Sequence, residues 1–163
     1  MSTAAILIAY DGSTAARAAV EQAGLLFAPR PAIVLTVWEP GLGDFMLAPD
    51  PMGAGTTMLP YDPSLGREID RANEDHAHDI AADGATLAGA AGLQAQALAI
   101  ADELHVADTI VTQAHDHGAA AIVVGSRGLR GLKSRLLGSS SRALLECSDL
   151  PVLVVRHPED HAD

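Results

Sequence analysis

Residues 119–146 read AAAIVVGSRGLRGLKSRLLGSSSRALLE, and three local patterns follow one another in this stretch. The apolar run at 119–125 is typical of a strand that is covered on both faces. A segment rich in glycine and basic residues follows, and then three serines stand where a helix would begin, because serine is a favoured N-cap residue. The order strand, glycine-rich loop, helix indicates an α/β domain.

Three other runs of the same kind predict buried strands at 4–10 (AAILIAY), 32–38 (AIVLTVW) and 151–157 (PVLVVRH). A weaker, alternating run predicts a further strand at 93–100 (LQAQALAI). Between the runs lie segments of helix length at 14–27, 66–90, 106–117 and 139–147. Because strands alternate with helices, we expect an α/β fold of the flavodoxin or Rossmann type: a doubly wound, mostly parallel five-stranded sheet with helices on both faces.

The length of 163 residues predicts a single domain over residues 1–157, with a flexible tail at 158–163. Residues 39–65 carry five of the nine prolines and predict one long loop insertion. Two interpretations of this loop stay open: a surface loop, or a lid whose apolar anchors are Phe45, Met46, Met58 and Tyr61. In the helix predicted after it, apolar spacing selects a stripe of Ile69, Ala72, His76, Ile80 and Leu87.

The composition excludes several classes of partner. A formal net charge of −11 argues against non-specific binding to nucleic acid or to an anionic membrane surface. No apolar run approaches the roughly 18 residues of a membrane helix, and the N-terminal run is too short for a signal peptide, so we expect a cytoplasmic protein. The single cysteine, Cys147, cannot form an internal disulfide and is expected to be a buried apolar residue.

The glycine-rich segment favours phosphate binding. Helix N-termini present backbone N–H groups and a partial positive charge, and glycine lets a ligand approach the backbone closely. Gly125 and Gly128 would turn the chain at the end of a strand, and Gly138 with Ser139, Ser140 and Ser141 would open the next helix. The alternative is that the glycines only form a loop and the serines only cap a helix.

Other phosphate-binding patterns are absent from the sequence. There is no GxxxxGK[ST] string, and the first predicted strand is followed by DGSTAA instead of GxGxxG. Ligands of doubly wound sheets bind at the carboxyl ends of the strands, near the point where strand order reverses. That edge would bring together Tyr10–Asp11, Val37–Trp38 and 125–127. At Asp11, the alternative to a ligand contact is an Asx turn with Gly12 and Ser13.

The spacing Gly125-x2-Gly128-x9-Gly138-Ser139 resembles the ATP-binding signature G-x2-G-x9-G-[ST] of the universal stress protein family. ILIAYDGS (6–13) is similar to that family's first strand with its aspartate, and AIVLTVWEP and SRALLECSDLPVLVVR are similar to its second and last strands. About 115 residues in the same order carry the resemblance. The resemblance implies an adenine nucleotide alpha hydrolase-like form of the predicted fold.

The resemblance also implies roles for individual residues. Ala9, Tyr10 and Asp11 would line the adenine and ribose side, and the backbone of Val37 would lie near the adenine ring. The ribose and inner phosphates would contact a second group of residues, Gly125, Ser126, Arg127 and Gly128. The outer phosphates, with or without Mg²⁺, would contact the helix start formed by Gly138, Ser139, Ser140 and Ser141.

The resemblance therefore implies ATP as the ligand and a regulatory or stress-response switch that acts through a protein partner. The alternative is a slow ATPase or an adenylyl-transfer enzyme that uses the same crevice. The apolar strand at 151–157 would lie at a sheet edge, and edges are usually covered or paired, so we expect a homodimer through it. Paired histidines two residues apart do not face each other on a helix, which makes a metal site there unexpected.

Overall fold

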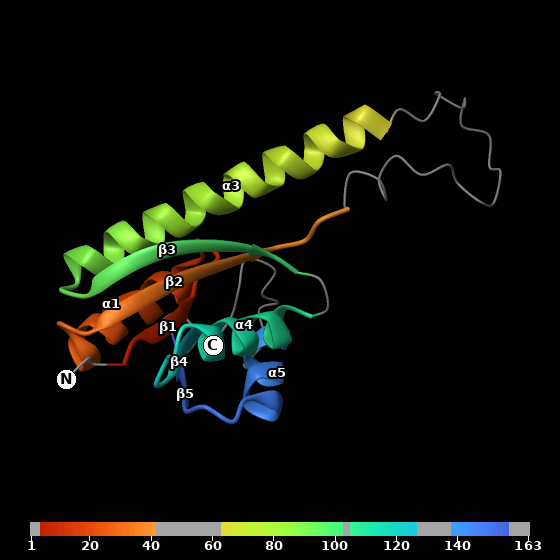
Figure 1. The fold of residues 1–163 in the computed structure, drawn as a ribbon. Helices are drawn as coiled ribbons and strands as arrows, with labels where there is room; N and C mark the ends of the chain where they lie inside the picture. The colour runs from red at the N-terminus through yellow and green to blue at the C-terminus, as the bar shows by residue number, and fades with distance from the viewer. Residues whose placement is uncertain (1–3, 42–62, 103–104, 127–137, 157–163) are drawn as a thin grey trace, which may run out of the picture.

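A computed structural model of the chain describes residues 4–41, 63–102, 105–126 and 138–156 (Figure 1). The elements in these residues are, in chain order, β1 (Ile6–Ala9), α1 (Thr14–Phe27), β2 (Pro31–Trp38), α3 (Pro63–Ala90), β3 (Gln94–Ala101), α4 (Val106–Asp116), β4 (Ile122–Gly125), α5 (Ser139–Cys147) and β5 (Val152–Val155).

The five strands form one sheet in the order β3-β2-β1-β4-β5, and every neighbouring pair is parallel. The chain builds outward from β1 to β2 and β3, and then returns to build β4 and β5 on the other side (Figure 1). The strand order therefore reverses between β1 and β4. The predicted five-stranded, doubly wound α/β fold is confirmed.

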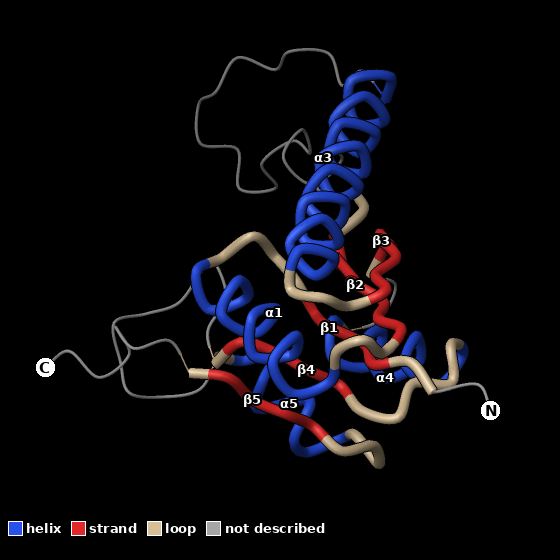
Figure 2. Tube along the Cα trace, turned by 90° about the vertical axis from the view of Figure 1, so that its left-hand side faces the viewer, coloured by secondary structure: helices blue, strands red, loops and turns tan. Residues whose placement is uncertain are grey.

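Helices cover both faces of the sheet (Figure 2). Successive side chains of β1 point to opposite faces, and their contacts show which helices cover each face. Ile6 and Ile8 belong to a core cluster with α1 and α3, whereas Leu7 belongs to a second cluster with α4 and α5. This division follows from right-handed crossovers, because helices that connect strands in opposite directions must lie on opposite faces.

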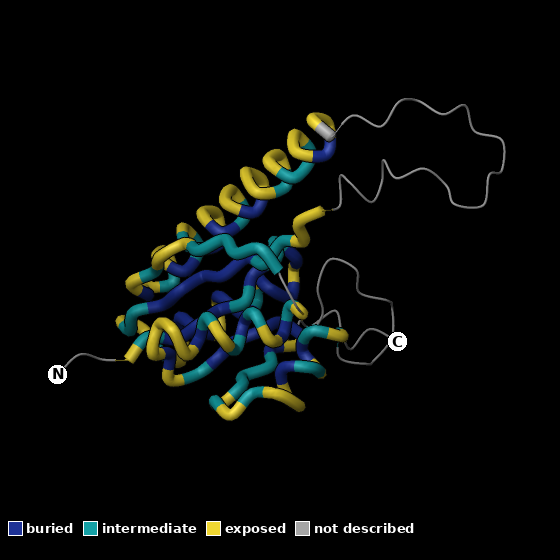
Figure 3. Tube along the Cα trace, turned by 45° about the vertical axis from the view of Figure 1, so that its right-hand side comes forward, coloured by how far each residue is buried: buried dark blue, intermediate teal, exposed yellow. Residues whose placement is uncertain are grey.

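Helix α3 differs from its prediction in two ways. It begins at Pro63, so residues 63–65 belong to the helix and not to the predicted insertion 39–65. Of the predicted stripe, Ile80 and Leu87 pack against the α1/α3 core, whereas Ala72 and His76 are exposed. Between residues 77 and 88 the buried positions of α3 are Ala77, Ala81, Gly84 and Ala88. Figure 3 shows buried and exposed positions alternating along this helix. The four loop residues proposed as lid anchors, Phe45, Met46, Met58 and Tyr61, lie outside the described residues.

The stripe of small residues lets α3 approach the sheet closely. A Cβ atom added to Gly84 would lie 2.6 Å from Cδ1 of Tyr10 and 2.8 Å from Cγ1 of Val34. Real Cβ atoms essentially never show such distances, so no other residue fits here without movement. Apolar spacing found Ile80 and Leu87 but missed the small residues between them, because close packing favours small residues where α3 meets the sheet.

The ends of the chain's last helix and strand also refine the predictions. Strand β5 lies at an edge of the sheet, as predicted, but it spans only Val152–Val155. Cys147 is exposed, so the expectation that it is buried was wrong. Helix α5 is short and buries only Ser141 and Leu144, which leaves its last turn in solvent. None of the described helices has the length and apolar character needed to cross a bilayer.

Replacing Gly84 with alanine should lower the free energy of unfolding by about 1–3 kcal/mol, because the new methyl group overlaps the buried ring of Tyr10. Gly89 of the same helix is a matched control, since an added Cβ there meets nothing within 4 Å. Gly89→Ala should leave the stability unchanged or raise it by up to about 1 kcal/mol. Urea unfolding of both variants measures the difference, and equal stabilities would contradict the close packing of α3.

Candidate functional site

The carboxyl end of β1 is fastened to β2 beyond the last residue of the strand. The backbone N–H of Tyr10 donates to the carbonyl of Leu35 (2.8 Å), and Oγ1 of Thr36 donates to the carbonyl of Tyr10 (2.9 Å). Thr36 is only 4% exposed, so this side-chain bond is shielded from water. It fixes the backbone just before Asp11. Sequence reasoning missed Thr36 because a threonine inside an apolar run gives no signal of its own.

After β1 the chain turns sharply into α1. The amide of Ser13 donates to Oδ1 of Asp11 (3.0 Å), and Gly12 takes a φ of +79°, which is unfavourable for other residues. Oγ of Ser13 then accepts from the amide of Ala16 (3.1 Å) and caps the helix. The Asx turn considered for Asp11 is therefore present. The contact of Asp11 with a ribose stays a prediction.

The carboxyl end of β4 lies against the first turn of α1. A Cβ atom added to Gly125 would lie 2.6 Å from the carbonyl carbon of Ala15, 2.7 Å from its oxygen and 2.9 Å from the nitrogen of Ala16. These are backbone atoms of a helix, which cannot move aside cheaply. Gly125 is thus required by the packing of α1. The first turn of α1 covers the α1/α3 face of the sheet where β1 and β4 end.

Beyond Gly125, the start of α5 is tied to the end of β4. The amide of Gly138 donates to the carbonyl of Ser126 (2.8 Å), and the amide of Ser126 donates to the carbonyl of Val155 (2.7 Å). In addition, Oγ of Ser141 donates to the carbonyl of Gly125 (2.8 Å). The residues between, 127–137, lie outside the described part of the chain, and so do the site residues Arg127 and Gly128.

These bonds set the N-terminus of α5 at the point where the strand order reverses. Gly138 occupies the N-cap position and provides no side-chain cap, and the first amides of a helix can bind an anion. Ser139 is exposed, Ser140 is partly exposed and Ser141 is buried. The hydroxyl of Ser141 donates to the carbonyl of Gly125 within the protein, so Ser139 and Ser140 are the two serines of this turn that remain accessible.

The predicted base-side residues fall on different faces of the sheet. Ala9 and Val37 both pack at the margin of the α4/α5 core, so their side chains share one face of the edge. The side chain of Tyr10 points to the other face, into the α1/α3 core, where its ring lies against Gly84. Only the backbone of Tyr10 can therefore line a crevice together with Ala9 and Val37.

The hydroxyl group of Tyr10 is buried and has no hydrogen-bond partner among the described residues. Burial raises the pKa of this phenol above its ordinary value of 10.0, and the nearby carboxylates of Asp83 and Asp11 act in the same direction. The positive charge of Arg17 opposes them. The side chain is thus a neutral part of the core.

A second aspartate lies at this edge, and sequence reasoning did not select it. Asp102 follows β3 directly, and its backbone amide donates to the carbonyl of Trp38 (2.7 Å). Oγ1 of Thr109, in α4, donates to Oδ1 of Asp102 (3.0 Å). Asp11 was selected because a carboxylate directly follows a predicted strand. The same signal exists at Asp102, but the weak alternating pattern predicted that β3 ends at residue 100, whereas it ends at Ala101.

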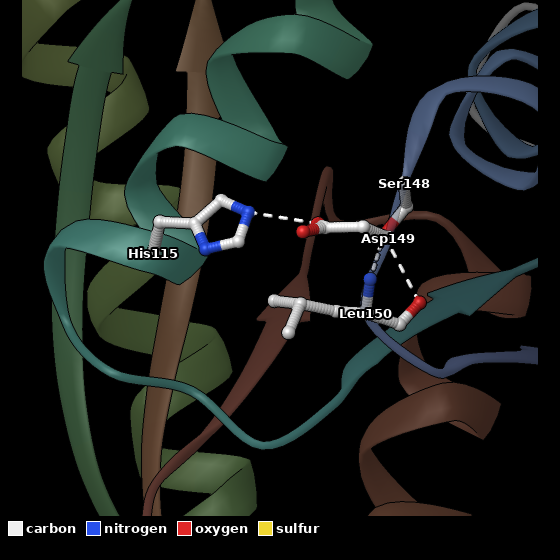
Figure 4. A network of polar contacts seen from close by, with 4 residues as sticks. All are labelled: His115, Ser148, Asp149 and Leu150. Carbon is white, nitrogen blue, oxygen red and sulfur yellow. Dashed lines mark hydrogen bonds and ion pairs between the residues drawn. The ribbon is translucent and has the colours of Figure 1, made fainter.

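A polar cluster at the opposite end of α4 is separate from this edge. Nε2 of His115 lies 2.8 Å from Oδ1 of Asp149, and the hydroxyl of Ser148 exchanges hydrogen bonds with the backbone of Leu150 (Figure 4). His115 is in the last turn of α4, as the sequence predicted, and the cluster links that turn to the segment before β5. Within the described residues no group of three metal-ligating side chains is present.

The sheet order defines a doubly wound α/β domain, and the backbone bonds place the start of α5 at the carboxyl end of β4, beside the reversal between β1 and β4. The sequence model of the universal stress protein family matches residues 3–156, and the chain belongs to that family.

Curated relatives carry the same family description. A universal stress protein of Thermus aquaticus is 31% identical over 153 residues, which cover 93% of this chain and 97% of that protein. The universal stress protein YxiE of Bacillus subtilis is 48% identical over 50 residues. That second match covers only 31% of this chain and 34% of the relative.

Solved structures share the fold at low sequence identity. The structure of protein MJ0577 has a TM-score of 0.71 at 21% identity and covers 96% of this chain and 98% of its own. A universal stress protein of Archaeoglobus fulgidus in complex with dAMP has a TM-score of 0.62 at 18% identity, covering 95% and 99%. A universal stress protein in complex with cAMP has a TM-score of 0.58 at 19% identity, covering 96% and 98%.

Replacing Tyr10 with phenylalanine should leave the protein as stable as before or stabilise it by about 1 kcal/mol, because a buried hydroxyl without a partner is removed. Because the folded-state pKa is raised, the unfolded chain releases this proton first, and stability falls as the pH rises above about 10. The variant should therefore show a shallower alkaline decline. Urea unfolding between pH 7 and 11 tests both points, and a marked loss of stability at pH 7 would show that the hydroxyl has a partner.

Proposed function

We propose that this protein binds ATP at the carboxyl edge of its sheet and acts as a nucleotide-dependent regulatory switch in the response to stress. The observation that carries the proposal is the hydrogen bond from Gly138 to Ser126, with a distance of 2.8 Å. It holds the amide groups at the start of α5 beside the reversal point of the sheet. Helix N-termini bind phosphate through such amides and through the helix dipole.

The packing of α1 supports one orientation of the nucleotide. Because α1 lies against Gly125, the ligand would enter from the α4/α5 face. Its phosphates would lie over Ser126 and the start of α5, with Ser139 and Ser140 as hydroxyl donors. The ribose would lie over Asp11, and the base over Ala9 and Val37. Arg127 and Gly128 would contribute from the segment that starts directly after Ser126.

The relatives support an adenine nucleotide as the ligand. Two similar structures are of universal stress proteins in complex with cAMP and dAMP, which share the adenine base with ATP. A Mg²⁺ ion would bind mainly through the triphosphate and not through a site made of protein ligands alone. Mg²⁺ is commonly held by substrate phosphates with few protein ligands, and Asp11 and the serine hydroxyls are oxygen donors of the right kind.

The purified protein should release ATP on denaturation, and calorimetry should measure binding of added ATP. Gly138→Val should abolish this binding, because a branched side chain at the N-cap obstructs the approach of phosphate to the helix amides. The backbone at Gly138 (φ −58°, ψ 158°) is open to any residue, so the variant should fold.

Gly89→Val is the matched control, since Gly89 is exposed and an added Cβ there meets nothing within 4 Å. It should bind ATP as the parent does. Thin-layer chromatography of the bound nucleotide separates a switch from the slow ATPase or adenylyl-transfer alternative, because a switch returns ATP intact. Unchanged affinity in Gly138→Val would remove the role of α5 in phosphate binding.

The proposal includes a homodimer formed through β5. This strand is an apolar edge, and edges that are left open tend to pair with another chain. Beside it runs a groove of about 460 Å³ between α1 and β5, lined by Ala18, Glu21, Gln22, Leu26, Leu153, Val154, Val155 and Arg156. Leu26 is 61% exposed in the single chain. A second copy that continues the sheet would cover both the edge and this leucine.

Sedimentation equilibrium at micromolar concentration should give twice the chain mass of 16.8 kDa. Leu26→Asp should shift the protein to the monomer, because a charge would be buried without a partner in the interface. Leu25→Asp is the matched control: Leu25 is the preceding residue, is 79% exposed and does not line the groove. A monomeric parent protein, or equal effects of the two variants, would contradict this interface.

A further inference from the structure

Asp102 is held in a defined position at the carboxyl end of β3. Its amide is bonded to the carbonyl of Trp38, at the end of β2, and its carboxylate accepts from Thr109, in the first turns of α4. The side chain is partly buried. Strand β3 ends and α4 begins at the same edge of the sheet (Figure 1). Two elements therefore fix the carboxylate.

The carboxylate of Asp102 lies on the α4/α5 face of the sheet, opposite the face that α1 covers. Leu98 and Ile100 pack at the margin of the α4/α5 core, and Asp102 continues their alternation along the chain. Its contact with Thr109 of α4 places it on the same face. Val37 is in register with Ile100, so Asp102 stands one strand over and about 7 Å further toward the rim than Val37.

The strand order then relates Asp102 to the proposed nucleotide. The start of α5 is tied to the end of β4, and β3 is three strands away from β4, a distance of about 14 Å. A nucleotide whose phosphates lie at β4 and whose ribose lies over β1 would extend its base across β2. The outer edge of that base would meet the end of β3.

We propose that Asp102 accepts a hydrogen bond from the exocyclic amine of the base and so selects adenine. This inference rests on the proposed nucleotide site. An ionised carboxylate only accepts hydrogen bonds, and the 6-amino group of adenine only donates them. A carboxylate has about four acceptor positions, so Asp102 can accept from the amine in addition to its contacts within the protein, such as the bond from Thr109. A base without the amine would leave a partly buried charge with one contact fewer, which weakens binding.

The test compares the affinity for ATP with that for purine riboside triphosphate, which lacks only the amine, by calorimetry. The parent protein should bind ATP about tenfold more tightly, the effect of one hydrogen bond to a charged group. Asp102→Ala should reduce this ratio to about one. Asp108→Ala is the matched control, because it removes one exposed carboxylate from the first turn of α4, and it should keep the tenfold ratio.

The outcomes separate the two proposals. A parent protein that binds neither nucleotide overturns the proposed function and this inference with it. Binding of ATP with equal affinity for purine riboside triphosphate overturns the role of Asp102 alone, and this comparison needs no variant to fold. The ratio of affinities for 2′-deoxyATP and ATP should be the same in Asp102→Ala as in the parent. If that ratio changes and the amine ratio does not, Asp102 binds the ribose and the inference is wrong.

Discussion

The contact between the first turn of α1 and the carboxyl end of β4 governs the arrangement of the whole edge. It exists only because Gly125 has no Cβ atom, since an added one would lie 2.6 Å from the backbone of Ala15. The contact closes one side of the reversal point between β1 and β4. On the α4/α5 face, the hydrogen bonds of Ser126, Gly138 and Ser141 hold the N-terminus of α5 at the carboxyl end of β4.

Close packing of small residues recurs through the α1/α3 face. With aromatics at only 3% of the chain, this core is filled by aliphatic side chains and by backbones that approach one another. Gly24 approaches Ala91, and Gly84 approaches Tyr10. The buried ring of Tyr10 carries a hydroxyl without a partner among the described residues, and the backbone of Tyr10 borders the proposed site. Tyr10 thus connects the packing of α3 to the end of β1.

Much of the fold could be predicted because local patterns report it directly. Apolar β-branched runs predicted β1, β2, β4 and β5, and a weaker alternating run predicted β3. Serine, proline and glycine signals placed the helix ends within a few residues. Predictions of which helix residues are buried were less successful. The burial of Cys147 was wrong, and of the predicted stripe on α3 only Ile80 and Leu87 pack against the core, because neither hydrophobicity nor residue type reports how closely a helix lies on its sheet or where it extends beyond it.

By itself, the sequence determined the parallel sheet, its strand order as a doubly wound type, the family and the glycine–serine start of α5. Periodicity and spacing are local properties, so they can be read from the sequence without the structure. Only the tertiary structure decided three points: Gly125 allows α1 to pack against β4, the ring of Tyr10 packs in the α1/α3 core, and Asp102 lies at the carboxyl edge of the sheet. These results depend on contacts between residues 7 to 110 positions apart, which form only when the sheet brings strand ends from the whole chain to one edge.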